Sequence, residues 1–240
     1  SLSQAGCAQR HVGPGLIANQ RLGSITIAVA PAINESGSTD FDPEHFADEM
    51  ANELGYVDGI NVVPVSRVLD VMREHAWDQV ESAAHALQIA DLLGADAMLV
   101  FAVTTYNAYD PPRIGVAAQL FGRGRDGESR LDPVKLSQSA ASTETPRRDE
   151  GGVLAQAARV FDASHEDLIR DLKGYAAERN SGDNPYGYRW YVISQRRFMQ
   201  YCCNATIRLL LAGGTDGAVT VKARGTEPRE KPEQKALAAR

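Results

Sequence analysis

The alternation of apolar and polar positions predicts a strand followed by a helix near the start of the chain. Residues 24–32 (SITIAVAPA) form a β-rich apolar run that ends in a proline and a polar loop, as expected of a buried strand leaving a sheet. Residues 42–54 carry large apolar side chains at every fourth position, which is the spacing of one helix face. Asp42 is the expected N-cap of this helix, and Gly55 follows its end.

The same order of strand and helix recurs further along the chain. A second strand is predicted over residues 60–65, with Ser66 capping the helix behind it. A further helix over residues 81–93 stops at Gly94. It leads to residues 97–103 (AMLVFAV), which are apolar at every position, as in a strand covered on both faces. We therefore expect this strand at the centre of the sheet.

The strands that follow are expected to be antiparallel. The sequence DPP at residues 110–112 forces a turn, and residues 113–123 form the next strand. Residues 134–141 have alternating character and predict a third strand, so the three should pair as a meander. Residues 142–152 are polar and charged, which predicts a surface loop.

Helices dominate the C-terminal part of the pattern. Ser164 begins a capping-box-like S-x-x-D motif ahead of a helix with one apolar face. Ser194 starts a last helix, which ends at Gly213 and Gly214. Residues 214–240 have too few large apolar side chains to offset the entropy lost on ordering, which predicts a tail.

Together these elements predict a mixed α/β fold, in which a three-layer mixed sheet carries helices on both faces and a C-terminal helical addition. The expected organisation is a tether at residues 1–23, one domain at 24–213 and a disordered tail at 214–240. Within the domain, residues 24–141 supply the sheet core and residues 158–213 the helical addition.

Composition argues against two classes of function. The chain has 240 residues, 43% of them apolar, and a net charge of −6. A nucleic-acid-binding surface must neutralise phosphates, so this acidic chain is not expected to bind nucleic acid. The nearest approach to a membrane span, residues 198–212, is too short and contains polar side chains. The body of the chain is therefore not expected to cross a membrane.

The residues around Cys7 set it apart from the other two cysteines. Ala5 and Gly6 are the small residues that precede the acylated cysteine of bacterial lipoproteins, and a polar stretch at residues 9–23 separates Cys7 from the first strand. We expect Cys7 to be a lipidation site. The alternative is an incidental cysteine in a disordered N-terminus.

No residue pattern identifies a catalytic, metal or cofactor site. Gly122, Gly124 and Gly127 fit G-x-G-x-x-G, but a strand is predicted after them where a dinucleotide site needs a helix. The histidines lack metal-ligand spacing. Cys202 and Cys203 are neighbours on a predicted helix, where they should behave as small apolar residues with one facing the core. The sequence thus predicts no catalytic residue, no metal and no cofactor.

An aromatic and basic cluster before the last helix is the best candidate for a protein–protein contact. Tyrosine, tryptophan and arginine dominate the binding energy of such contacts. The cluster consists of Tyr186, Tyr188, Trp190, Tyr191, Arg196 and Arg197. The alternative interpretation is structural, because tyrosine and tryptophan also anchor loops onto sheets.

Three segments between residues 25 and 121 carry a family resemblance. They are ITIAVAPAINES at the first strand, INVVPVSRVLDVMRE at the second strand and its helix, and ALQIADLLGADAMLVFAVTTY at the central strand. This stretch resembles the periplasmic domain of the curli-secretion lipoproteins and of the lipoprotein activators of penicillin-binding proteins. The resemblance implies a cell-envelope lipoprotein whose domain recruits or assembles other proteins, with Cys7 at the acylation site. The shared motifs are packing motifs and not a catalytic signature.

The expected function is therefore a non-catalytic protein-binding or assembly module. It would be periplasmic, held at the outer membrane by a lipid anchor alone, and bound to an envelope protein or to further copies of itself. Two alternatives stay open. One is a small-substrate enzyme with a site at the carboxyl ends of strands 24–32 and 97–103, using Asp40 or Tyr106. The other is a structural subunit of an oligomer.

Overall fold

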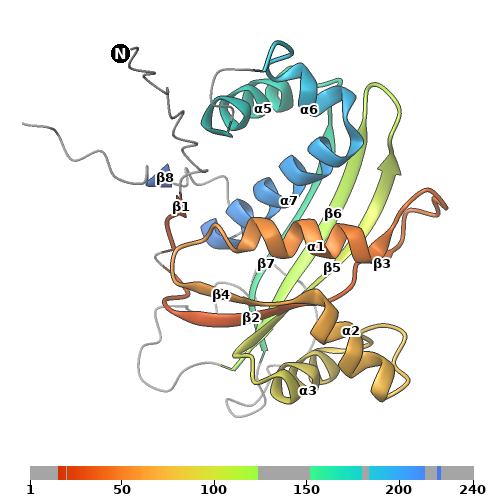
Figure 1. Ribbon diagram of the computed structural model, residues 1–240, viewed down its shortest axis with the longest axis vertical. Helices are drawn as coiled ribbons and strands as arrows, with labels where there is room; N and C mark the ends of the chain where they lie inside the picture. The colour runs from red at the N-terminus through yellow and green to blue at the C-terminus, as the bar shows by residue number, and fades with distance from the viewer. Residues whose placement is uncertain (1–15, 20, 124–151, 180–183, 214–220, 223–240) are drawn as a thin grey trace, which may run out of the picture.

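A six-stranded mixed sheet lies between two layers of helices (Figure 1). This arrangement confirms the predicted fold class. The computed structural model describes residues 16–19, 21–123, 152–179, 184–213 and 221–222. Cys7, Gly124, Gly127 and the strand predicted at 134–141 lie outside these residues.

The sheet combines a parallel half with an antiparallel half. Its order is β4-β2-β5-β6-β7, with β3 also paired to β5. β2 runs parallel to β4 and β5, whereas β5, β6 and β7 form an antiparallel meander. The central place of β5 was predicted. The strands are β2 (Ile25–Val29), β3 (Ile33–Asn34), β4 (Ile60–Val63), β5 (Ala97–Asn107), β6 (Arg113–Gly122) and β7 (Gly152–Asp162).

β7 is a strand that the sequence analysis missed. It pairs with β6 over the whole length of that strand, so residues 158–162 belong to the sheet and not to the helical addition. The inward side chains Ala155 and Ala157 are small, so the segment lacks the strong apolar alternation that marks a strand.

One helical layer covers β5, β6 and β7. The core between this layer and the sheet contains four fully buried phenylalanines, Phe46, Phe101, Phe161 and Phe198. Figure 1 shows α5 and α6 at the top of the view, with α7 and α1 in front of the sheet. These helices are α1 (Pro43–Leu54), α5 (Glu166–Arg179), α6 (Arg189–Ile193) and α7 (Gln195–Ala212).

The opposite face is covered by α2 (Val65–Glu74) and α3 (Ala83–Leu93), at the bottom of Figure 1. Val68, Met72 and Ile89 from these helices pack with Met98 and Phe121 from the sheet. The two cores lie on opposite sides of the same strands, because alternate residues of a strand point to opposite faces.

Several helix ends confirm the capping predicted from sequence. Asp42 accepts hydrogen bonds from the backbone of Glu44 and His45, and Ser194 accepts one from Arg197. Gly94 ends α3 at φ 67°, and Gly213 ends α7 at φ 81°. This left-handed backbone conformation favours glycine.

Two predicted caps are wrong. The N-cap of α2 is Pro64, and Ser66 lies inside the helix. Ser164 does not cap α5: the helix begins at Glu166, and among the described residues no backbone N–H of its first turn donates to the Ser164 hydroxyl, which itself donates to Asp162. In both cases the predicted cap does not lie at the start of the helix: α2 starts at Val65, before Ser66, and α5 starts at Glu166, after Ser164.

Residues assigned to the tether contact the domain, and two residues assigned to the tail pair with the tether. Ile17 is 1% exposed, and its backbone exchanges hydrogen bonds with Tyr56 and Asp58. The short strands β1 (Leu16–Ile17) and β8 (Val221–Lys222) pair antiparallel. The folded body therefore includes residues outside the predicted range of 24–213.

Candidate interaction surface

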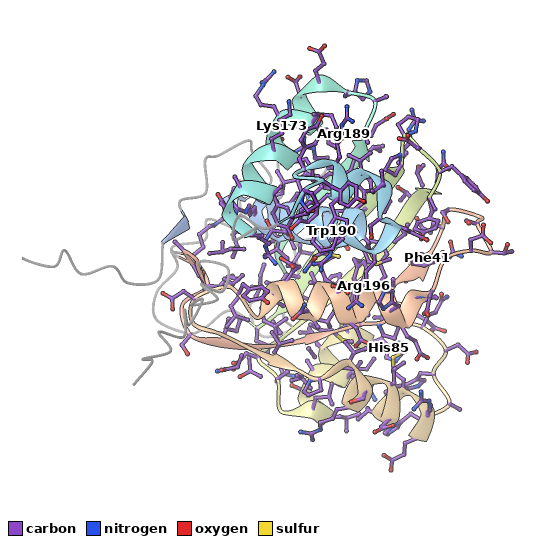
Figure 2. All side chains as sticks on the ribbon, turned by 45° about the horizontal axis from the view of Figure 1, so that its top comes forward. Phe41, His85, Lys173, Arg189, Trp190 and Arg196 are labelled. Atoms are coloured by element: carbon purple, nitrogen blue, oxygen red, sulfur yellow. The ribbon has the colours of Figure 1, made fainter. Side chains whose placement is uncertain are left out.

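The outer side of the α5, α6 and α7 layer gathers most of the predicted contact residues. Two further cations, Lys173 of α5 and Arg189 of α6, lie with them, and the sequence analysis did not select these. Figure 2 shows Lys173 and Arg189 at the top, Trp190 below them and Arg196 beside α1. We define the basic–aromatic surface as Lys173, Tyr186, Tyr188, Arg189, Trp190, Arg196 and Arg197.

A cation–π contact between Trp190 and Arg197 lies at the centre of this surface. The guanidinium carbon of Arg197 is 4.3 Å from the centre of the Trp190 ring system, and its Nη1 donates a 3.0 Å hydrogen bond to Gln200. The contact follows from Ser194, which ends α6 and caps α7. Ser194 has an extended backbone conformation and lies between the two helices. It redirects the chain so that Arg197 of α7 packs over the ring of Trp190 of α6.

A second cation–π contact joins α5 to the segment before α6. The Lys173 ammonium is 4.9 Å from the centre of the Tyr188 ring, and Tyr188 packs partly against the core. Tyr186 projects further, with 62% of its surface exposed. The surface therefore offers fixed rings with cations held beside them.

Among the described residues, three of the four cations of this surface have no carboxylate partner, and the fourth is Arg196. On α5, Asp167 pairs with Arg170, Asp171 with Arg159 and Glu178 with Arg208. Within the described ranges, no ion pair involves Lys173, Arg189 or Arg197. A positive region thus stands on a protein whose net charge is −6.

Arg196 has a structural partner. Its Nε donates a 2.7 Å hydrogen bond to Glu49 of α1, whose side chain is 5% exposed while that of Arg196 is 70% exposed. A buried carboxylate without a cation would carry a large desolvation cost. Arg196 therefore holds α1 and α7 together at the border of the surface.

Tyr191 is part of the core and not of the surface. It is 2% exposed, and its ring meets that of Tyr175 edge-on at 5.3 Å. Burial raises the pKa of its phenol. The neighbouring Trp190 is only partly buried, a difference that the sequence could not show because α6 has five residues, too few to display a helical period.

A buried ion pair beneath the surface was also missed. Both terminal nitrogens of Arg179 donate to the carboxylate of Glu53, which is fully buried, and Asn204 of α7 donates to the same group. Burial raises the pKa of Glu53, while Arg179 and Asn204 act in the opposite direction. The available signal was a pair of glutamates, Glu49 and Glu53, on the apolar face of α1.

Both cysteines of α7 are completely buried, although only one was expected to face the core. The helix packs against β6 and β7 on one side and against α1 and α6 on others, so two neighbouring positions are covered. Burial raises the pKa of the Cys202 and Cys203 thiols well above the ordinary value, which keeps them protonated.

The alternative enzymatic site places Tyr106 against helix α7. Gln195 donates a hydrogen bond to the Tyr106 hydroxyl, and the ring lies 5.4 Å from that of Phe41. Burial raises the Tyr106 pKa, and Asp40 adds to that effect. The phenol therefore stays protonated at neutral pH and is unsuited to act as a general base.

A serine, an aspartate and a histidine meet at the turn between β7 and α5 without forming a catalytic triad. Asp162 accepts hydrogen bonds from the backbone and the hydroxyl of Ser164 and from Arg113. His165 Nε2 is 3.8 Å from the same carboxylate. Because the serine donates to the aspartate and not to the imidazole, no base activates it.

The described residues form neither a metal site nor a membrane-spanning helix. In the ranges described above, no group of three or more histidine, cysteine, aspartate or glutamate side chains could hold a metal ion. Among the same residues, no helix is both long and apolar enough to span a membrane.

Comparisons with known proteins give similarities to solved structures alone. No family model matches the chain, and no curated protein matches it. The LpoB C-terminal domain from Salmonella enterica matches at 12% identity with a TM-score of 0.39, over 57% of this chain and 82% of that one. Lipoprotein GNA1162 from Neisseria meningitidis matches at 17% identity and a TM-score of 0.41, over 64% and 95%.

A third similar structure is the PelC dodecamer from Paraburkholderia phytofirmans. It matches at 11% identity with a TM-score of 0.33, over 83% of this chain and 95% of that one.

Proposed function

We propose that this chain is a non-catalytic, protein-binding module of a cell-envelope lipoprotein, and that its basic–aromatic surface binds an acidic segment of the partner. The observation that carries the proposal is that, within the described part of the chain, Lys173, Arg189 and Arg197 form no ion pair. Two of these cations lie over aromatic rings, Lys173 over Tyr188 and Arg197 over Trp190. Carboxylates of a partner would complete charge-assisted hydrogen bonds with these groups.

The geometry supports binding because the surface is held in place before a partner arrives. Arg197 is fixed by Trp190 and Gln200, so less side-chain entropy is lost when it meets a carboxylate. Trp190 and Tyr186 add rigid ring area, of the kind that dominates protein interfaces. The net charge of −6 repels an acidic partner at long range, so this positive surface sets the orientation in which such a partner approaches.

A binding measurement with simple peptides tests the surface. The wild-type protein is titrated with a labelled oligoglutamate peptide and with an oligolysine peptide of equal length. We expect the first to bind, with an affinity that falls as salt rises. Arg197→Glu and Lys173→Glu should each weaken binding by roughly tenfold or more.

Arg170→Glu is the matched control, because Arg170 is an exposed arginine of α5 that already pairs with Asp167. It should retain most of the binding. Equal affinity for the two peptides, or unchanged binding by Arg197→Glu, would show that this surface does not select an acidic partner.

The envelope part of the proposal rests on Cys7, its small neighbours Ala5 and Gly6, and the family resemblance of residues 25–121. Intact mass and membrane fractionation of the full-length protein, expressed in its own cell type, test it. We expect a lipid-sized mass increase and membrane association, both lost in Cys7→Ser. An unmodified wild-type protein would remove the anchor and leave the peptide experiment unaffected.

A further inference from the structure

β7 has a long unpaired edge within the described residues. It ends the sheet, with β6 as its single neighbour there, and it has 11 residues. The strand at the opposite end of the sheet, β4, has four. An unpaired edge presents free backbone donors and acceptors to another strand, and natural proteins usually block long edges.

Two of the usual blocking features are absent from β7, and its one bulge, at Leu154, lies near its N-terminal end. Its sequence, GVLAQAARVFD, contains neither lysine nor proline, the residue types that most often protect an edge. Its one cation, Arg159, points toward the helical layer, where it pairs with Asp171 of α5 at 3.3 Å and lies over the Phe161 ring. The Arg159 guanidinium therefore lies on the helical side of the sheet and not on the exposed face of β7.

The sheet face beside this edge also lacks charge. On this face, α2 and α3 cover β2, β4 and part of β5 and β6. They do not cover β7, where Val160 is 55% exposed and Val153 is 40% exposed. Ala158 and Gln119, on the same face, are exposed too. The ion pairs Arg113–Asp162 and Arg123–Asp91 lie at the two ends of this face.

We infer that a second copy of this chain pairs with β7, antiparallel and edge to edge, about a twofold axis at Ala157. In that register no charged residue faces another, since Arg159 lies opposite Ala155 of the second copy and Ala157 lies opposite itself. Like charges directly opposite each other would destabilise the pair. The interface is self-complementary, as a twofold dimer requires, and it is separate from the basic–aromatic surface.

Charge substitutions at Ala158 test the dimer. This side chain is exposed on the open face, and in the inferred register the two copies of Ala158 are diagonal neighbours across the axis. Ala158→Lys and Ala158→Glu should each raise the dissociation constant of the dimer by roughly twofold to fivefold. An equimolar mixture of the two variants should recover it, because opposite charges then meet.

Sedimentation velocity across a concentration series measures the exchange between a 25.9 kDa monomer and a species of twice that mass. Gln119→Lys is the control, since Gln119 lies on the same face but on β6, away from the edge. It should leave the dimer intact. Circular dichroism of each variant checks that the fold is retained, and recovery in the mixture cannot come from an unfolded chain.

Three outcomes would overturn the inference. The first is a wild-type protein that stays monomeric at all concentrations, in which case amide exchange at 152–162 tells whether another part of the chain covers the edge. The second is a dimer that Gln119→Lys disrupts and Ala158→Lys does not. That result would mean that the two copies pack through the exposed face of the sheet and not through the β7 edge. The third is two Ala158 variants that fail to recover when mixed.

Discussion

Arg179 of α5 donates hydrogen bonds of 2.8 and 2.5 Å to Glu53 of α1, across 126 residues of sequence. The guanidinium of Arg179 also lies 4.8 Å from the ring centres of both Tyr56 and Tyr175. This one side chain therefore connects α1, the first helix of the domain, to α5, one of the helices that carry the basic–aromatic surface.

Removing Arg179 should be strongly destabilising. Arg179→Met leaves Glu53 buried without its cation, and we expect a loss of about 3–5 kcal/mol in the free energy of unfolding, measured by urea denaturation. Arg170→Met, which breaks an exposed pair, should cost less than about 1 kcal/mol. The double variant Glu53→Leu with Arg179→Met should recover much of the stability, because no unpaired charge remains. Equal costs for the two arginines would contradict this account.

The hydroxyl of Tyr175 should contribute little to stability. It is buried and has no hydrogen-bond partner among the described residues, as is also true of Tyr201. Tyr175→Phe keeps the ring and removes a polar atom that lost its water on folding, so we expect a neutral or stabilising effect within about 1 kcal/mol. Tyr175→Ala should cost about 3–5 kcal/mol, since the ring is lost as well. A large thermal destabilisation of Tyr175→Phe would indicate that the hydroxyl is in fact bonded.

Asp162 predicts a pH-dependent contribution to stability. The hydrogen bonds from Ser164, followed by those from Arg113, lower its pKa to about 2. A carboxyl with a lowered pKa stabilises the fold above its ordinary pKa of roughly 3.9, and this stability is lost as the pH falls through the folded value. The difference in urea midpoint between wild type and Asp162→Asn should therefore be constant above about pH 5 and shrink between about pH 4 and pH 2. A difference that stays constant down to pH 2 would exclude this carboxyl as the cause.

Two glycines should respond in opposite ways to alanine. Gly94 has φ 67° at the end of α3, where Gly94→Ala should cost about 1 kcal/mol because a Cβ strains the left-handed conformation. Gly174 lies inside α5 with open space around its Cβ position, so Gly174→Ala should stabilise the protein by about 0.5–1 kcal/mol. Melting temperatures of the two variants measured side by side check this, and a shift in the same direction for both would contradict it.

Local sequence determined most of the elements before β7 and the ends of the main helices. Asp42, Gly94, Ser194 and Gly213 define helix ends through contacts within a few residues, and such contacts are visible in a linear pattern. The apolar run of β5 likewise determined its central position, because a strand covered on both faces needs apolar side chains on both.

Tertiary structure alone decided the parts that depend on distant segments. β7 is a strand because β6 supplies its partner, while its own alanines give only a weak pattern. Tyr191 is buried while Trp190 is only partly buried, because Tyr191 packs against Tyr175, a residue of another helix. Glu53 tolerates full burial because Arg179 arrives from a helix far along the chain. The strand partner of β7, the burial of Tyr191 and the cation beside Glu53 all come from segments far away in the sequence. No interaction between sequence neighbours specifies them, so they are visible only in the folded structure.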